Sequence, residues 1–300
     1  MSALERIAAR IDALNPLHSK KIRRNLKGKD SSFHERATNF FDHYEKWLID
    51  DGLSLDYAVD CYLKMLADMN FESVQFLRDG KYSSQSFEEV NQRVYNNPDV
   101  MDYYMHGLLL SQFLWSHHYD ILINFSQTLA GSTGKVENYL EIGGGHGLYI
   151  SEAIDVLGNS TSFDLVDISE SSLAISKKMI RDNDVNFIHS DIFEYETESR
   201  YDWITMGEVL EHVEEPVGLL ERLQYLLSDN GRIYITTPTN APAIDHIYLF
   251  RNADDVREVI ANAGLIVEEE HCLYTEEGVD EEFAEKHKIP MMYVGLLKAH

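Results

Sequence analysis

The 300-residue sequence predicts an α/β protein with a mostly parallel seven-stranded sheet, flanked by helices and preceded by an all-helical N-terminal domain. Two observations predict this fold class. The first 130 residues carry helical periodicity and almost no strand signal. From residue 137 onward, short β-branched runs alternate with helical segments, the pattern of parallel strands joined by crossover helices. We therefore expect a helical domain over residues 1–130 and a second domain over residues 136–300, separated by the turn-like segment Gly131–Gly134.

The helices of the N-terminal half are marked by apolar spacing and by start and stop signals. Apolar residues from Leu4 to Leu14 predict a first helix, and Pro16 predicts its end. Ser32-Phe-His-Glu35 and Ser86-Phe-Glu-Glu89 both fit the capping box, in which a hydroxyl and a carboxylate satisfy free backbone donors, and so predict two helix starts. Further helical patterns cover residues 40–48, residues 57–76 and one long stretch from residue 98 to about residue 130.

Seven β-branched segments supply the strands of the predicted sheet. Helical segments lie between most of them, which favours parallel pairing with both faces of the sheet covered. The predicted strands are Tyr139–Ile142, Ser162–Val166, Val185–His189, Trp203–Met206, Arg232–Thr236, Leu265–Glu269 and Met291–Leu297.

The charge balance narrows the range of partners. The chain holds 51 acidic and 26 basic residues, a net charge of −25, and such a surface repels phosphate backbones and anionic lipid. We therefore expect no nucleic-acid partner and no membrane partner. Residues 1–30 nevertheless carry a local net charge of +5, concentrated in the basic segment 20–29. We expect this segment to be a solvated arm, or to dock on the protein's own acidic surface or on a second copy.

The sequence also predicts a cytoplasmic location. Its two cysteines, Cys61 and Cys272, lie far apart, and the chain opens without the basic and apolar regions of a signal peptide. The longest nearly apolar run, Met105–Trp115, is too short for a membrane span.

The most informative segment is a glycine-rich loop between the first predicted strand and the following helix. It reads Glu141-Ile-Gly143-Gly-Gly145-His-Gly147, so the backbone can turn sharply and a ligand can approach the main chain at a helix N-terminus. A dinucleotide fingerprint fails, because Leu148 or Ile150 stands where its last glycine is required. This failure disfavours a nucleotide-dependent oxidoreductase.

The E-x-G-x-G-x-G spacing resembles the first motif of the class I S-adenosyl-L-methionine-dependent methyltransferases, and two acidic strand ends agree with it. Asp167 ends the second strand, 20 positions past Gly147, where a carboxylate can accept both ribose hydroxyls, although a helix-capping role is the alternative. Asp191 ends the third strand and resembles the family's adenine pocket. The resemblance thus implies the following cofactor-binding residues: Glu141, Gly143, Gly144, Gly145, Gly147, Asp167, Ile168, Asp191, Ile192, Met206 and Gly207.

A second motif follows the fourth strand. Glu208-Val-Leu-Glu211-His212-Val is similar to the E-V-L-E-H-V segment of ubiquinone-pathway-type O-methyltransferases and their relatives. Together the motifs cover about residues 137–300 and imply a Rossmann-like domain that methylates a small-molecule acceptor, with a hydroxyl oxygen as the favoured nucleophile. Methylation of nitrogen or carbon, and cofactor binding without methyl transfer, remain alternatives. His146 departs from the family's usual residue types, so its role is open.

Methyl transfer is an in-line displacement that needs positioning above all, and a hydroxyl nucleophile must also lose its proton. His212 and His246 are the candidate catalytic bases, since both follow carboxyl ends of predicted strands. At helical spacing, Glu208, Glu211 and His212 would share one face and could bind a divalent cation together with His246. Small-RNA 2′-O-methyltransferases carry E-x-x-E-H here as a metal site, although their spacing to the next His differs. A metal site, a metal-free base and a structural role all remain open.

The helical half loosely resembles the dimerisation and lid region that precedes the catalytic domain in many small-molecule O-methyltransferases. The resemblance implies a homodimer formed through this domain. Candidates for lining the acceptor pocket in this domain are Tyr104, His106 and Ser111, together with Tyr103, His117 and His118, although aromatic residues at helical spacing are commonly core residues.

Overall fold

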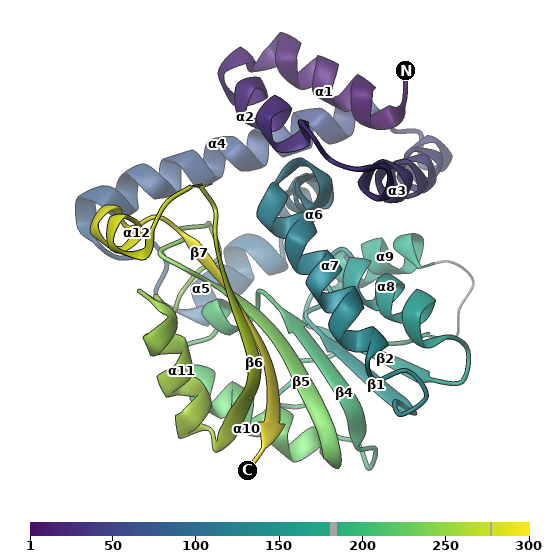
Figure 1. Ribbon diagram of the computed structural model, residues 1–300, viewed down its shortest axis with the longest axis vertical. Helices are drawn as coiled ribbons and strands as arrows, with labels where there is room; N and C mark the ends of the chain where they lie inside the picture. Colours follow the sequence, from purple (N-terminus) through teal and green to yellow (C-terminus); the bar gives the residue numbers. More distant parts are fainter. Residues whose placement is uncertain (181–184, 277) are drawn as a thin grey trace.

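A computed structural model describes residues 1–180, 185–276 and 278–300. A cap of helices lies across one edge of a seven-stranded sheet (Figure 1). The N-terminal helices are α1 (Ala3–Leu14), α2 (Pro16–Leu26), α3 (Ser31–Asp50), α4 (Leu55–Asp79), α5 (Phe87–Val90), the π-helical turn η1 (Asn91–Tyr95), α6 (Pro98–Leu114) and α7 (Ser116–Ala130).

The helix starts only partly follow the predicted capping boxes. Ser86 caps α5 as expected, its hydroxyl accepting the backbone N–H of Glu89 at 3.3 Å. The capping box at Ser32 is wrong, because Asp30 caps α3 and its carboxylate accepts the N–H of Phe33 at 2.9 Å. A carboxylate two residues earlier in the chain satisfies that donor, so the helix begins at Ser31.

The single long helix predicted from residue 98 to residue 130 is also wrong, because Trp115 is extended and separates α6 from α7. The Trp115 indole N–H donates to the Tyr62 hydroxyl of α4 at 2.7 Å. The break allows α6 to pack into the cap core while α7 buries Phe125 and Leu129 against the sheet. Helical periodicity continues on both sides of Trp115, so the sequence pattern alone does not reveal the change of direction.

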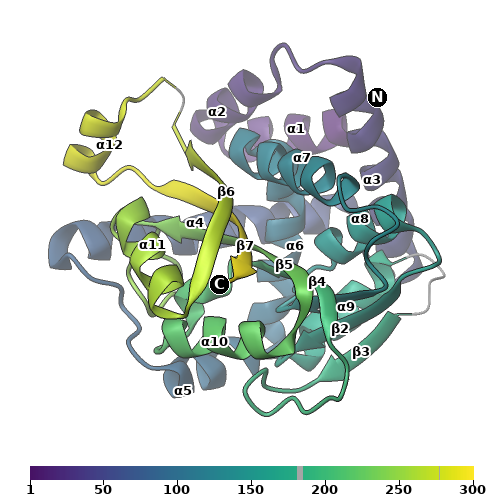
Figure 2. The same ribbon diagram turned by 60° about the horizontal axis from the view of Figure 1, so that its bottom comes forward.

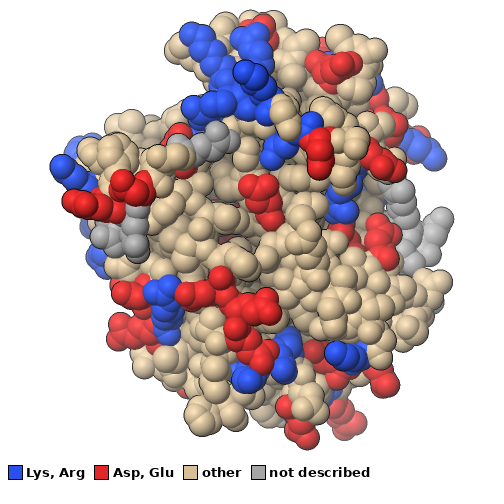
Figure 3. All heavy atoms as spheres, in the orientation of Figure 1, with Lys and Arg blue, Asp and Glu red and all other residues tan. Residues whose placement is uncertain are grey.

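The basic segment 20–29 is largely helix α2 and its connection to α3, not a solvated arm. Lys21 pairs with Glu276 at 2.7 Å, and Arg23 pairs with Asp12 at 2.8 Å. These contacts agree with the alternative that the segment docks on the protein's own acids. Lys and Arg side chains gather over α2 at the top of the molecule (Figure 3).

All seven predicted strands are confirmed, with several extended by the structure. They are β1 (Asn138–Ile142), β2 (Ser162–Asp167), β3 (Val185–His189), β4 (Tyr201–Gly207), β5 (Leu227–Thr239), β6 (Leu265–Tyr274) and β7 (Met291–Ala299). The strand order is β3-β2-β1-β4-β5-β7-β6, and only β7 runs antiparallel to its neighbours. The fold is therefore Rossmann-like, a mostly parallel sheet.

Helices cover both faces of this sheet (Figure 2). On one face, α7 packs with α8 (Leu148–Leu157) and α9 (Glu170–Met179). On the other face lie α10 (Pro216–Leu226) and α11 (Ala253–Asn262). Two short helical segments complete the fold: η2 (Leu210–His212) after β4, and α12 (Glu281–His287) between β6 and β7.

The cap closes the carboxyl edge of the sheet, because its apolar core continues into Leu148, Ile175 and Ile244 from the segments after β1, β2 and β5. Helix α7 belongs to the first 130 residues but packs on the sheet, and the division of the chain near residue 130 stays a prediction. In the described part of the chain, no helix combines the length and the apolar character that a membrane span requires.

Candidate active site

A cavity of ≈ 950 Å³ lies between the cap and the carboxyl ends of the strands. Its walls come from α2, α4, α6 and α7 and from the segments that follow β1 to β5. Small-molecule sites occupy about 300–1,000 Å³. The cavity stands at the upper end of that range, so it has room for a cofactor and an acceptor side by side.

The glycine loop after β1 forms one end of the cavity. Gly143 has a φ of 64°, and a Cβ there would lie 2.5 Å from Cγ2 of Val209. Gly147 has a φ of 76°, and a Cβ there would lie 2.9 Å from Cα of Ser176. Both positions therefore require glycine, which lets the backbone pass close to its neighbours and present main-chain groups to a ligand.

Acidic side chains follow β2 and β3 at the same end. The buried Asp167 carboxylate accepts the N–H of Gly145 at 3.1 Å and the N–H of Ser169 at 2.8 Å. Burial raises its pKa to about 6. Ser169, rather than Asp167, caps α9, so the helix-capping alternative for Asp167 is wrong. Asp191 follows β3 and accepts the N–H of Phe193 at 2.9 Å.

The residues at this end fit S-adenosylmethionine. Two of the roughly four lone-pair sites of the Asp167 carboxylate are used by the protein, which leaves acceptors for ribose hydroxyls. Glu141 is buried beside the loop, accepts the Tyr139 hydroxyl at 3.2 Å, and has its pKa raised well above the ordinary value by burial. The predicted cofactor residues that line the cavity are Glu141, Gly143, Gly144, Gly145, Asp167, Ile168, Asp191, Ile192 and Gly207. Those not among its lining residues are Gly147, which precedes α8, and Met206, which is buried in the core of the sheet.

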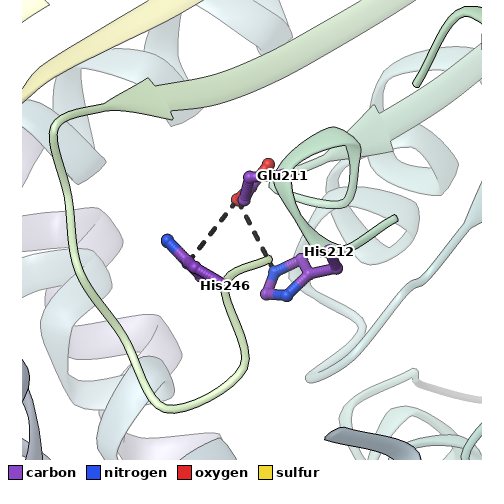
Figure 4. A group of neighbouring side chains, drawn as sticks. All are labelled: Glu211, His212 and His246. Carbon is purple, nitrogen blue, oxygen red and sulfur yellow. Dashed lines mark ion pairs between the residues drawn. The ribbon is translucent and has the colours of Figure 1, made fainter. Parts of the chain in front are cut away.

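A second polar group lies by the segments after β4 and β5. The ligand atoms of Glu211, His212 and His246 all lie within 4.8 Å of one another (Figure 4). One Glu211 oxygen, Oε1, is 3.6 Å from Nε2 of His212 and 3.8 Å from Nε2 of His246. The other, Oε2, accepts the Thr237 hydroxyl at 2.9 Å, whereas Oε1 is buried and has no hydrogen-bond partner among the residues that the structure describes. Burial raises the pKa of Glu211 to about 6.

His212 is held from two sides. Its Nδ1 lies 3.0 Å from the Asp245 carbonyl oxygen and 3.0 Å from the Tyr95 hydroxyl of η1 in the cap. Burial alone would lower its pKa, but the carboxylates of Asp245 and Glu211 outweigh that effect and raise it. The neighbouring His246 has its pKa lowered to about 4 by burial and by His212.

Glu208 does not share a face with Glu211 and His212, so the predicted helical arrangement of E-x-x-E-H is wrong. The segment turns at Glu208, which has a φ of 54°, and only Leu210–His212 form a short helical turn. Among the described residues, the compact group of candidate metal ligands consists of Glu211, His212 and His246. Glu208 Oε1 instead lies 4.0 Å from Nε2 of His118 on α7.

The candidate acceptor residues of the cap lie in different places. Tyr104, His117 and His118 line the cavity, whereas the Tyr103 hydroxyl donates to Asp68 of α4 at 2.6 Å. His106 is buried in the cap core, where its Nδ1 lies 2.6 Å from the Tyr44 hydroxyl, and Ser111 is buried 2.9 Å from Nδ1 of His118. Neither is among the residues that line the cavity.

Other polar residues of the cavity were not predicted as site residues. Asp245 stands next to His246 in the sequence, and this adjacency could have indicated it. Tyr95 reaches the site only because the cap folds over the sheet edge, which no local pattern predicts. His146, whose role the sequence left open, lines the cavity and accepts the N–H of Leu148 at Nδ1, and burial lowers its pKa to about 4.

The fold and this site define a class I S-adenosylmethionine-dependent methyltransferase. The chain belongs to the methyltransferase domain family, whose model matches residues 114–285.

Two relatives match about a third of the chain. Malonyl-[acyl-carrier protein] O-methyltransferase 1 of Ilyobacter polytropus is 31% identical over 104 residues, which are 34% of this chain and 38% of the relative. The mitochondrial ubiquinone biosynthesis O-methyltransferase of Schizosaccharomyces pombe is 32% identical over 103 residues, 33% of this chain and 36% of the relative. The chain therefore matches less than two fifths of the length of these relatives.

Solved structures of methyltransferases share the fold. An O-methyltransferase family protein from Burkholderia thailandensis has a TM-score of 0.54 and 16% identity, covering 82% of this chain and 74% of that protein. The plantazolicin methyltransferase BpumL, solved with S-adenosylhomocysteine, has a TM-score of 0.51 and 16% identity, covering 79% and 100%. At these identities the likeness concerns the fold alone.

Proposed function

We propose that this methyltransferase transfers the methyl group of S-adenosylmethionine to a hydroxyl oxygen of a small molecule held in the cavity. One observation carries the proposal: the cavity joins the cofactor end at the glycine loop to the polar wall around His212 beneath the cap. The O-methyltransferase relatives support oxygen as the nucleophile.

The chain's own residues supply binding and positioning. The cofactor, when bound, would supply a methyl group that the nucleophile takes in line from the sulfonium sulfur, so that the sulfur–methyl bond breaks and the neutral thioether S-adenosylhomocysteine leaves. The glycine loop and Asp167 hold the nucleoside, while Tyr104 and Met105 of α6 cover the cavity from the cap side. Holding the reacting atoms collinear in a site closed to water accounts for much of the acceleration in such a reaction.

His212 is the proposed acceptor of the hydroxyl proton. The Asp245 carbonyl oxygen can only accept a hydrogen bond, so in the neutral form of His212 the proton is on Nδ1 and Nε2 has the lone pair; this neutral form is the proposed base. The acceptor's O–H bond breaks as the proton passes to Nε2, while its oxygen forms the new bond to the methyl carbon. The carboxylates of Asp245 and Glu211 stabilise the resulting imidazolium.

A divalent cation at Glu211, His212 and His246 is the second candidate, favoured by the unpartnered Oε1 of Glu211. Ligand atoms about 2.1 Å from a tetrahedral ion lie about 3.4 Å apart, close to the 3.6 and 3.8 Å separations found here. The hydrogen bond of His212 Nδ1 to the Asp245 carbonyl would fix its ring as a ligand. A cation here would hold the acceptor oxygen and lower its pKa.

Elemental analysis of protein purified without a His tag separates the two candidates. After dialysis against candidate ions, a cation site predicts close to one equivalent per chain, reduced by Glu211→Gln and His246→Asn but unchanged by His271→Asn, a change at an exposed strand position. Less than a tenth of an equivalent excludes the cation.

Turnover with hydroxylated acceptors tests the function itself. We expect O-methylated products and a kcat lowered about 10²–10⁴-fold by His212→Asn, with S-adenosylhomocysteine affinity unchanged. Products methylated on nitrogen or carbon, or full activity of His212→Asn, would contradict the proposal.

A further inference from the structure

We propose that Glu208 and His118 together bind a second hydrogen-bond donor of the acceptor, a hydroxyl or amino group close to the oxygen that is methylated. This inference rests on the proposed function and concerns the choice of acceptor. It assigns recognition to a side chain from each part of the molecule, Glu208 after β4 and His118 on α7.

The backbone at Glu208 is strained in a way that places its side chain at the cavity. Its φ of 54° is in the left-handed region that residues other than glycine rarely occupy. The surrounding structure enforces it, since the Glu208 N–H donates to the Thr236 carbonyl oxygen at 2.9 Å and lies 3.1 Å from the Thr236 hydroxyl. Such strain concentrates at functional sites. Here its result is a carboxylate among the cavity-lining groups, with 31% of the side chain exposed.

The Glu208 carboxylate has no hydrogen-bond partner among the described residues. Its closest cationic or imidazole group is Nε2 of His118 at 4.0 Å, beyond hydrogen-bond length. Burial, with Glu211 and Asp245 nearby, raises the pKa of Glu208 to about 8, so the surroundings disfavour its charge. A ligand that donates a hydrogen bond would satisfy this oxygen.

His118 is fixed by the cap. Its Nδ1 lies 2.9 Å from the Ser111 hydroxyl and 3.3 Å from Nε2 of Gln112, and its ring packs 4.8 Å from that of Trp115. Nε2 is therefore the nitrogen that faces Glu208. One hydroxyl or amino group can sit about 2.8 Å from both atoms, beside the 4.0 Å gap.

In the sequence, Glu208 also lies between residues at the cofactor end of the cavity and the polar group that contains His212. Gly207, directly before it, lines the cavity. Val209, directly after it, lies where a Cβ on Gly143 of the glycine loop would collide. Glu211 and His212 follow in the next turn. A group bound at Glu208 is therefore close to both the cofactor end and His212, and so belongs to the reacting part of the acceptor.

Calorimetry on protein loaded with S-adenosylhomocysteine tests the pair with matched probes. Catechol and 2-aminophenol carry a second donor beside the hydroxyl, whereas phenol lacks it. We expect the wild type to bind the two-donor probes at least tenfold more tightly than phenol. The preference should disappear in Glu208→Leu, fall in His118→Asn, and persist in Glu221→Leu, a matched change at an exposed position of α10. Glu208→Gln keeps the side chain's shape and an acceptor oxygen, so it should retain part of the preference even if Glu208→Leu folds poorly.

Three results would overturn the proposal. The wild type could bind the two-donor probes no more tightly than phenol, or Glu208→Leu could keep the full preference for the two-donor probes. In the third result, Glu208→Leu loses as much affinity for S-adenosylhomocysteine as for the two-donor probes. The last would show that Glu208 holds the cofactor. These outcomes are independent of the proposed function, whose failure appears as absent or misplaced methyl transfer while the binding preference remains.

Discussion

The carboxylate of Asp167 accepts the backbone N–H of Gly145 at 3.1 Å, which joins the end of β2 to the glycine loop after β1. A second bond from the N–H of Ser169 fixes the other oxygen. The carboxylate is therefore oriented before any ligand binds, and its remaining lone pairs are available to ribose hydroxyls.

Replacing Asp167 by Ala should weaken S-adenosylhomocysteine binding by about 10²–10⁴-fold. The variant loses the acceptor of two ribose hydroxyls, hydrogen bonds to a charged acceptor contribute about 1.5–3 kcal/mol each, and about 1.4 kcal/mol corresponds to a factor of ten. Calorimetry measures this directly. The exposed Asp229→Asn serves as the control and should leave the affinity unchanged. Equal affinities for wild type and Asp167→Ala would mean that the ribose is bound elsewhere.

The raised pKa of Asp167 predicts opposite effects of pH on cofactor binding and on stability. Below about pH 6 the folded protein protonates this carboxyl, so S-adenosylhomocysteine affinity should fall as an acceptor is lost. The unfolded chain takes up the same proton only near pH 4, so this group's contribution to stability rises as the pH falls from 6 to 4. The difference between wild type and Asp167→Asn, measured by calorimetry and by urea unfolding, isolates both effects. A pH-independent difference would contradict the assignment.

Two glycines with the same backbone conformation allow a matched test of the loop. Gly147 has φ 76° and ψ 14°, and Gly80 at the end of α4 has φ 68° and ψ 14°, but a Cβ at Gly147 would lie 2.9 Å from Cα of Ser176, whereas at Gly80 nothing lies within 4 Å. In both Ala variants the free energy of unfolding should fall by about 1–2 kcal/mol, because a residue with a Cβ is strained in the left-handed conformation. Only Gly147→Ala should lose further stability and bind S-adenosylhomocysteine less tightly. Equal unfolding free energies of the two variants would argue against close packing of the loop on α9.

Helix α4 offers a face for the predicted homodimer. Phe71, Val74 and Leu77 recur at helical spacing and are 61%, 66% and 70% exposed. If two copies meet there, Val74→Glu should give a monomer by light scattering, while Ile49→Glu on α3, which is 63% exposed in this chain, should not. If the wild-type protein is already monomeric at micromolar concentration, the prediction of a homodimer is wrong.

The sequence predicts the sheet well, and most residues of the predicted cofactor site line one cavity, because both features depend on local patterns. β-branched runs mark the strands, and in a parallel sheet the residues ending β2 and β3 must meet the glycine loop at one edge. Local patterns do not predict the arrangement of the cap helices or of the polar residues after β4. The break at Trp115 depends on a hydrogen bond to Tyr62 of another helix, and Glu208 leaves the predicted helical face because Thr236 of β5 holds its backbone. Those features arise from tertiary contacts that spacing along the chain does not encode.

The central claim is that the cavity transfers a methyl group to a hydroxyl oxygen. Incubating the protein with a set of hydroxylated small molecules and trideuteromethyl S-adenosylmethionine, followed by mass spectrometry and NMR of the products, tests it most directly. We predict a product with the labelled methyl on oxygen, reduced by Asp167→Ala when the cofactor is below saturation and strongly reduced by His212→Asn at any cofactor concentration. A label found on nitrogen or carbon, or no labelled product from a protein that binds S-adenosylhomocysteine tightly, would contradict the claim.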